Sequence, residues 1–273
     1  MQIILIEMKD YLDTNNNGQT TFKVSNTSKA EHLLKEKRFD EALVEIDRLL
    51  KNDENYENLN LKGMILDNLS RYGEAIGCFN KALGLNNSEE IKINKANCFY
   101  HWAKVTFFPE GNYDKALELI NNGIMTIPHS EDPSEFYFLK AEILEALNDL
   151  VESHKAYLIA YGEFERLEEF EKQTEYLQNT TDTLINIVGC DFYGYTPEVG
   201  NIVNLIKDED NEHDSDAVAV VVSEKTVGYV ANSDYTLIDE VKSARSIKNM
   251  LSDDQKAEIL FIYLGEYVIA KLI

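Results

Sequence analysis

The cysteines and histidines of this chain are the residues whose types and spacing bear most directly on metal binding and covalent catalysis. Cys98 and His101 lie three positions apart, so a helix would place both on one face, where they could share a metal ion. A zinc site needs a second pair at such spacing, and neither Cys78 nor Cys190 supplies one. The five histidines also have no serine, cysteine or aspartate at a recognisable triad spacing. We therefore expect no bound metal.

Nucleotide chemistry has no signature in this sequence either. The chain contains no G-x-x-x-x-G-K-[ST] loop and no G-x-G-x-x-G motif, which are the glycine-rich turns that hold phosphates. Its 49 acidic side chains are scattered, so chance carboxylate pairs carry no information about acid–base catalysis. We expect a non-enzymatic protein without a cofactor.

A polar run, Asn211-Glu212-His213-Asp214-Ser215-Asp216, has two interpretations. Asn and Asp between two strands commonly form turns by bonding to the local backbone. Alternatively, the same side chains face a ligand. The residues alone leave both interpretations open.

The segments around this run predict a small β-rich domain over 185–273. Apolar residues there change from a period near 3.6 to one near 2, in stretches rich in Val, Ile and Tyr. We predict six strands, the last two joined at Gly265-Glu266, and one helix over 234–251 that is capped by Ser233-Asp234. Six strands and one helix in so short a segment suggest a partly closed barrel. The predicted strand segments are 185–193, 201–207, 217–223, 225–231, 258–264 and 266–273.

Three motifs follow one another in this domain: Gly189-Cys190-Asp191-Phe192-Tyr193, then Asn211 to Val220, then Val227-Gly228-Tyr229-Val230. In this order they resemble the motifs of a HIRAN domain. The resemblance implies an OB-like barrel that holds the 3′ end of single-stranded DNA, with an aromatic ring stacked on a base. It also implies that Asp214 accepts a hydrogen bond from a terminal hydroxyl. The DNA-binding residues carried over by position are Phe192, Tyr193, Asn211, His213, Asp214 and Tyr229.

Two departures from the family pattern and the charge of the domain favour a different function. His213 stands where the family usually has Tyr, and Asp191 stands where the DNA-binding member has a basic residue. Residues 185–273 carry seven basic and sixteen acidic side chains, a net charge of −9, within a chain of net charge −23. A basic cluster, Lys242, Arg245 and Lys248, has the spacing of one helix face. DNA affinity nevertheless depends largely on neutralising phosphates, to which a domain of net negative charge is poorly suited. The alternative function is therefore a protein-only scaffold whose barrel does not bind DNA.

The first part of the chain is repetitive. Four Lys-small pairs, at Lys29, Lys62, Lys95 and Lys140, recur at spacings of 33, 33 and 45 residues. Each is followed by a helix-spaced set of apolar and small residues, which is typical of stacked helical hairpins. The segment 61–87, with Gly63, Tyr72, Ala75, Phe79 and Ala82, resembles a tetratricopeptide repeat. We predict an α-solenoid over 23–184, with about four repeats and a capping helix, and leave 1–22 as a short N-terminal segment.

The third repeat contains eight additional residues between its small residue and its aromatic residue. They fall within 97–113, so its first helix is expected to be about two turns longer and to carry several aromatic rings. Either those rings pack against a neighbouring element, or they project as a contact surface for a partner.

Helical repeat arrays are usually binding scaffolds, so we expect a protein partner in the groove of the repeats. The groove positions are mixed polar, with too few cations to hold an acidic C-terminal tail. A neutral or basic, partly apolar partner segment fits them better. The positions that we predict to contact the partner are Asn60, Met64, Asn68, Asn97, His101, Phe138 and Glu142.

The cysteine content and the N-terminus bear on location. Three widely separated cysteines suggest no disulfide framework, which fits a reducing compartment. The segment 1–13 has an apolar run too short for a membrane span and no basic flank or cleavage site of a secretory signal. We expect a cytoplasmic protein without membrane contact; its oligomeric state has no signature in the sequence.

Overall fold

The computed structural model describes residues 28–233, 236 and 238–273. The expected N-terminal segment 1–22 and the beginning of the first repeat, including residue 23, lie outside the described residues. The chain divides into two compact units. Among the described residues, one comprises those up to Trp102 with Thr126–Pro128, and the other comprises Ala103–Met125 with those from His129 to Ile273.

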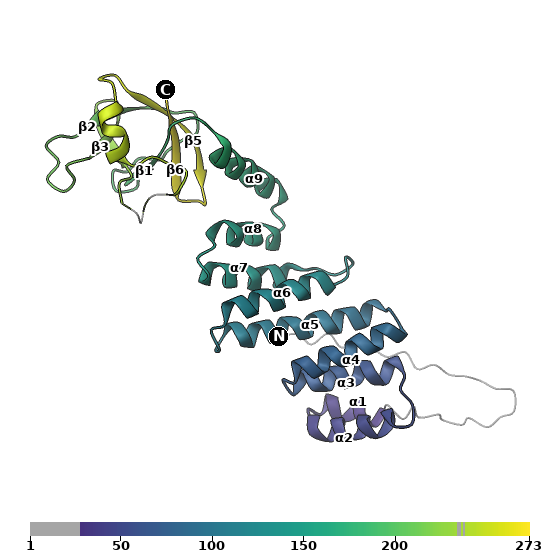
Figure 1. Cartoon of the computed structure of the whole chain (residues 1–273). Coiled ribbons are helices and arrows are strands. Elements are labelled where there is room, and N and C mark those ends of the chain that lie inside the picture. The colour runs from purple at the N-terminus through teal and green to yellow at the C-terminus, as the bar shows by residue number, and fades with distance from the viewer. Residues whose placement is uncertain (1–27, 234–235, 237) are drawn as a thin grey trace. The chain divides into compact units, whose positions relative to one another are not determined.

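The first unit is a stack of antiparallel helical hairpins (Figure 1). Buried small residues let its helices approach closely, and aromatic and branched side chains fill the spaces beside them. Ala30, Gly63 and Ala96, the small members of three Lys-small pairs, are all buried, as the repeat pattern predicts. The helices are α1 (Ser28–Lys35), α2 (Phe39–Leu50), α3 (Tyr56–Asn68), α4 (Tyr72–Leu85) and α5 (Glu89–Phe107), which continues past Trp102 into the second unit.

The helix α5 has the predicted extension. It contains 19 residues, whereas α3 and α7 contain 13 each. The half-buried ring of Trp102 stacks on Tyr72 with ring centroids 6.0 Å apart and planes 18° apart. Phe108, directly after the helix, is exposed. The packing interpretation thus holds for Trp102, whereas Phe108 is left exposed.

The second unit begins with helices and ends with the barrel. In the hairpin of α7 and α8, Ala141 and Ala156 pack with Leu144, and Ser153 donates from Oγ to the carbonyl of Ala141 at 3.0 Å. The buried hydroxyl of Ser153 therefore has a backbone partner. The helices are α6 (Tyr113–Thr126), α7 (Ser134–Ala146), α8 (Leu150–Ala160) and α9 (Phe164–Asn179).

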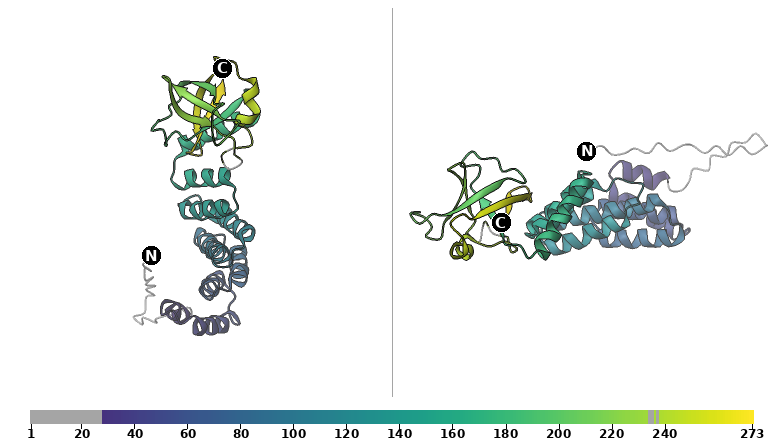
Figure 2. Two further views of the ribbon diagram at one scale, coloured as in Figure 1. Left: turned by 90° about the vertical axis from the view of Figure 1, so that its left-hand side faces the viewer. Right: turned by 90° about the horizontal axis from the view of Figure 1, so that it is seen from above.

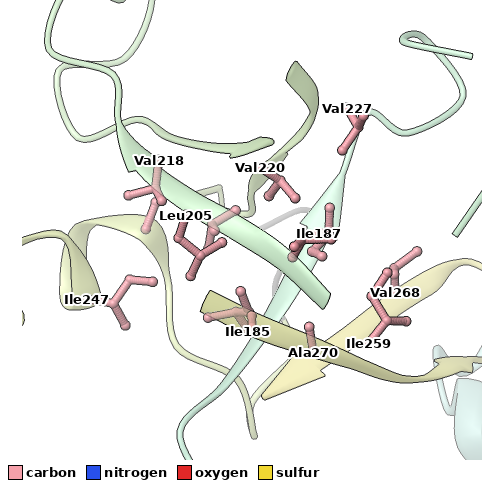
Figure 3. Close-up of a cluster of buried hydrophobic side chains, with 14 of the residues drawn as sticks. Ile185, Ile187, Leu205, Val218, Val220, Val227, Ile247, Ile259, Val268 and Ala270 are labelled. Carbon is pink, nitrogen blue, oxygen red and sulfur yellow. The ribbon is translucent and has the colours of Figure 1, made fainter. Parts of the chain in front are cut away.

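Six strands of the described residues form a closed antiparallel barrel in the order β1-β4-β3-β2-β5-β6. Figure 2 shows the strands curving around a common interior. Figure 3 shows that interior filled by branched side chains from every strand, including Ile187, Leu205 and Val220, with Ile247 from the short helix. The strands are β1 (Leu184–Val188), β2 (Ile202–Lys207), β3 (Val218–Val222), β4 (Lys225–Val230), β5 (Lys256–Tyr263) and β6 (Tyr267–Leu272).

The predicted fold class, an α-solenoid followed by a small β-barrel, is confirmed, but two element predictions are wrong. The strand predicted over 185–193 ends at Val188, because Gly189 adopts a left-handed φ of 78° and begins a turn. Of the helix predicted over 234–251, residues 234–235 and 237, with the cap residue Asp234, lie outside the described residues, and the described part is helical only in α10 (Ala244–Ile247) and a 3₁₀ turn, η1 (Lys248–Met250). Among the described residues, no helix is both long and apolar enough to cross a membrane.

Gly228 marks a close approach between two strands. A Cβ at this position would lie 2.8 Å from the carbonyl oxygen of Val188 and 3.1 Å from Cγ2 of Ile187. Backbone cannot move aside as a flexible side chain can. We therefore expect Gly228→Ala to lower the free energy of unfolding of the barrel by about 1–3 kcal/mol, the usual cost of overpacking. Chemical denaturation followed by circular dichroism measures this loss.

The matched control is Gly84→Ala on α4, where an added Cβ meets nothing within 4 Å. Because alanine favours a helix more than glycine does, this variant should be neutral or up to about 1 kcal/mol more stable. Equal stabilities of the Gly228→Ala variant and the wild type would contradict the close approach.

Candidate functional site

A cavity of about 570 Å³ on the barrel brings together most of the residues singled out in its sequence. Tyr193, Asn211, His213, Asp214 and Tyr229 all line it, although they come from three separate segments. We call it the barrel pocket. It is lined by Val188, Tyr193, Asn211, His213, Asp214, Ala217, Tyr229, Val230, Asn232, Ser233 and Thr236.

Aromatic rings form one wall of the barrel pocket. The turn after β1 places Phe192 edge-on against Tyr193, with ring centroids 5.1 Å apart and planes at 85°. Tyr193 in turn lies 6.2 Å from Tyr229 of β4. Phe192 does not line the cavity itself and is 86% exposed. The turn therefore holds a free aromatic face beside the pocket, where a flat ligand group could stack.

The polar run 211–216 forms a tight turn and also faces the pocket. The side-chain oxygen of Asn211 accepts from the backbone N–H groups of His213 and Asp214, both at 3.0 Å. One carboxylate oxygen of Asp214 accepts from the N–H of Asp216 at 2.8 Å. The two interpretations left open by the sequence are compatible, because the bonds that make the turn also direct Asp214 and His213 to the cavity.

The carboxylate of Asp214 is held in its charged form. Its second oxygen accepts from Nδ2 of Asn232 at 2.9 Å. This bond, followed by the one from Asp216, lowers the pKa of Asp214 below its usual range. Asp214 is thus an ionised hydrogen-bond acceptor at neutral pH. Nothing in the sequence singles out Asn232, which follows β4 and reaches Asp214 only in the folded barrel.

Tyr229 presents a protonated hydroxyl. Its OH donates to Oδ2 of Asp208 at 2.9 Å, and Asn211 donates to the same oxygen at 3.0 Å. Burial first, and then the bond to Asp208, raise the pKa of Tyr229 to about 12. The Tyr229 ring is therefore fixed in place and uncharged. The role of Asp208 was missed in the sequence, where it begins an unremarkable acidic run.

The predicted basic cluster is not one free helix face. Lys242 precedes α10, while Arg245 and Lys248 belong to α10 and η1. Nε of Arg245 donates to Asp216 at 2.7 Å, and Nζ of Lys248 donates to the carbonyl of Ser215 at 2.6 Å. Both cations therefore stabilise the turn over 211–216 and are engaged with it. Little positive charge remains near the pocket, and Asp191 adds an exposed carboxylate.

The positions predicted to contact a partner in the first unit have mixed accessibility. Asn60 is buried and accepts from Asn94 at 3.1 Å, so its side chain serves contacts between α3 and α5. His101 is exposed, and its Nδ1 lies 2.9 Å from Oδ2 of Asp67. Asn97 is exposed, and Asn68, also exposed, donates to the carbonyl of the half-buried Met64 at 2.8 Å.

Cys98 and His101 do not form a metal site. The Cys98 thiol is fully buried and donates to the carbonyl of Tyr72 at 3.8 Å, and burial raises its pKa. His101 pairs instead with Asp67. Within the part of the chain that the structure describes, no group of three or more His, Cys, Asp or Glu side chains is placed to hold a metal ion.

In the second unit, the predicted contact residues Phe138 and Glu142 lie on α7. Glu142 is exposed, and Phe138 is half-buried against a tyrosine of α8 and the tyrosine that directly follows α8. These tyrosines, Tyr157 and Tyr161, were not predicted as contact residues. Their signal was their spacing of four residues, which brings them to the same side of the helix end.

No family model matches the chain, and no curated protein matches it. Solved structures of MamA are similar to about half of it. A MamA RS-1 ArsTM double mutant is 20% identical and has a TM-score of 0.37, with coverage of 50% of this chain and 71% of that chain. A crystal structure of MamA is 19% identical with a TM-score of 0.38 and coverage of 55% and 80%. MamA 41-end from Desulfovibrio magneticus RS-1 is 16% identical with a TM-score of 0.28 and coverage of 54% and 94%. Similarity at this level supports no statement about function.

Proposed function

We propose that this chain is a non-enzymatic adaptor whose helical repeats, of the tetratricopeptide type, bind a protein segment. In this proposal the HIRAN-like barrel binds the 3′ end of single-stranded DNA. One observation carries it: residues from three distant segments, matched to the family by position, line a single pocket with an exposed aromatic ring beside it.

The chemistry of the pocket suits a strand end better than an internal nucleotide. Phe192 and Tyr193 offer ring faces on which bases stack, a contact that tolerates any base sequence. Asp214, ionised and oriented by Asn232, accepts a hydrogen bond from a hydroxyl and repels a phosphate. A free 3′-hydroxyl therefore fits beside Asp214, whereas a 3′-phosphate does not.

The electrostatics predict weak binding. Arg245 and Lys248 are engaged with the turn over 211–216, so few cations are left to neutralise phosphates. The affinity should come mainly from stacking and the hydroxyl contact, with a shallow dependence on salt. The same observation favours the second candidate function, a protein-only scaffold in which the barrel contacts a protein.

A titration of the full chain separates these two functions. Fluorescein-labelled single-stranded oligonucleotides with a free or a phosphorylated 3′ end are titrated by anisotropy at 20–50 mM salt. We expect dissociation constants in the micromolar range or weaker for the free end, and weaker binding for the phosphorylated end. Phe192→Ala with Tyr193→Ala should cost about 1–3 kcal/mol of binding free energy for each base that loses its stacking partner.

Asp214→Asn tests the discrimination between the two ends. Without the negative charge, the 3′-phosphate oligonucleotide should bind nearly as well as the free end. Phe108→Ala, which removes an exposed ring outside the barrel, is the control and should bind like the wild type. Absence of binding by the wild type, or binding unchanged by the double aromatic substitution, would leave the protein-only scaffold as the function.

A further inference from the structure

Three aromatic rings of the second unit form an exposed cluster away from the barrel pocket. Phe138 of α7 packs edge-on against Tyr161, with centroids 4.9 Å apart and planes at 83°. Tyr157 of α8 lies 6.4 Å from Phe138 and is stacked near Tyr161 at 6.5 Å. We call these three residues the Phe138–Tyr161 cluster. They come from α7, from α8 and from the residue that directly follows α8, so the hairpin itself sets their arrangement.

The cluster is open to solvent at one ring. Tyr161 is 66% exposed, whereas Phe138 and Tyr157 are half-buried. Tyr161 directly follows α8, and Gly162 after it turns the chain with a φ of 70°. The ring of Tyr161 thus lies at a helix end with most of its surface in water. Its exposed apolar area does not contribute to folding stability. Such a ring is available to a partner.

Two carboxylates border the cluster. Glu142 and Glu145 lie four and seven positions after Phe138, so all three share one face of α7. Oε2 of Glu145 accepts from the OH of Tyr157 at 3.3 Å. No described residue forms an ion pair with Glu142 or Glu145, and both are exposed.

The negative charges of these carboxylates act on the neighbouring Tyr157. Burial, and then the charges of Glu145 and Glu142, raise the pKa of Tyr157 above its usual value. The face of an aromatic ring carries negative partial charge and attracts cations within about 6 Å. The rings and the carboxylates therefore favour the same kind of ligand group, a positively charged one, and disfavour an acidic one.

We propose that the Phe138–Tyr161 cluster binds an arginine side chain of a basic protein segment. The guanidinium stacks on the exposed ring of Tyr161, and its N–H groups donate to the carboxylates of Glu142 and Glu145. Arginine fits better than lysine because its planar group can stack on a ring and donate two parallel hydrogen bonds to one carboxylate. This inference rests on the proposed function of the helical repeats, since it specifies which protein segment they bind.

The test uses the full chain and a pair of synthetic peptides. The probe is a fluorescein-labelled peptide, Gly-Ser-Arg-Leu-Arg-Ser-Gly, and its partner has both arginines replaced by citrulline, a neutral group of the same shape. Fluorescence anisotropy at 50 mM salt measures both. We expect only the arginine peptide to bind, and Tyr161→Ala to weaken it about three- to thirtyfold, the range of an exposed to desolvated cation–π contact. Glu142→Gln with Glu145→Gln should weaken binding to a similar extent.

Matched controls separate this contact from the general attraction of an acidic chain. Glu165→Gln with Glu171→Gln on α9 removes the same charge from exposed positions outside the cluster, and Phe108→Ala removes an exposed ring elsewhere. Both variants should bind the arginine peptide like the wild type. Far-UV circular dichroism should be the same for all variants, because the replaced side chains are exposed.

Four results would overturn the inference. Two concern the wild type: it does not bind the arginine peptide, or it binds the citrulline peptide equally well. The third is a loss of binding in the α9 control equal to that in Glu142→Gln with Glu145→Gln. The fourth is a wild-type dimer in sedimentation that Tyr161→Ala dissociates. The last result would make a second copy of the chain the occupant. The oligonucleotide titration on the same samples is independent. DNA binding can fail while peptide binding depends on Tyr161, and the reverse can also occur, so the two failures are distinguishable.

Discussion

Replacing Phe79 with alanine is expected to lower the free energy of unfolding of the first unit by about 3–5 kcal/mol. Phe79 is 1% exposed and belongs to the buried cluster that joins α3, α4 and α5, with Leu59, Leu66 and Ile91 among its neighbours. Its ring lies directly on Gly63, because a Cβ built there would be only 2.6 Å from the ring. Because the ring fills buried space within this cluster, its removal leaves a cavity that adds to the lost apolar burial.

Denaturation followed by the fluorescence of Trp102 measures this loss. Trp102 is the single tryptophan of the chain, and it belongs to the first unit, so its signal reports on that unit. Leu85→Ala at the end of the same helix is the control, since Leu85 is exposed and its loss should change stability by less than about 0.5 kcal/mol.

A double-mutant cycle tests the contact with Gly63 itself. Gly63→Ala alone should destabilise, because its new methyl group meets the Phe79 ring, whereas in the Phe79→Ala background the same change should be neutral or favourable. Additive effects of the two substitutions would contradict the contact.

Replacing Phe170 with alanine is expected to have an effect of similar size, about 3–5 kcal/mol, in the second unit. Phe170 of α9 is 4% exposed and stacks on Tyr263 of β5 with centroids 4.9 Å apart and planes at 15°. The ring of His154 of α8 also lies beside it, with ring centroids 4.6 Å apart. Thr174, one turn later, lies 2.9 Å from the Tyr263 hydroxyl. Phe170 therefore connects α8 and α9 to the barrel, and its loss should destabilise both these helices and the barrel.

Hydrogen exchange measured by mass spectrometry checks this connection. In Phe170→Ala, peptides from α9 and from β5 should both exchange faster than in the wild type. Phe164→Ala, at the exposed start of the same helix, should leave both rates unchanged. Tyr263→Phe removes only the hydroxyl contact and should cost about 0.5–1.5 kcal/mol. Faster exchange confined to α9 would show that the barrel does not depend on Phe170.

Most element types could be read from the spacing of apolar residues. Gly63 and Phe79 lie at the small and aromatic positions of a helical hairpin, and both are buried against each other. The alternation of Val218, Val220 and their neighbours predicted a strand, and both side chains face the barrel core (Figure 3). These patterns are local, because a helix and a strand each require one periodicity whatever lies beyond them.

The predicted helix over 234–251 shows where local pattern is insufficient. The N–H of Lys242 donates to the carbonyl of Leu184 in β1 at 2.7 Å, and the N–H of Ala244 donates to Ala231 at 2.9 Å. Asn186 donates from its side chain to the carbonyl of Thr236 at 2.7 Å. In a long helix, the N–H groups of Lys242 and Ala244 and the carbonyl of Thr236 would form hydrogen bonds within the segment. Closure of the barrel supplies other partners for them, which the sequence of the segment does not reveal.

The sequence by itself determined the repeat register, the six strands, and five of the residues that line the barrel pocket, namely Tyr193, Asn211, His213, Asp214 and Tyr229. Only the tertiary structure decided which partners their side chains have. It placed Asn232 on Asp214, engaged Arg245 with Asp216, and brought Tyr161 against Phe138. The physical reason is that a side chain's pKa, exposure and partners depend on residues that chain folding brings near it, whereas periodicity records only which face each residue occupies.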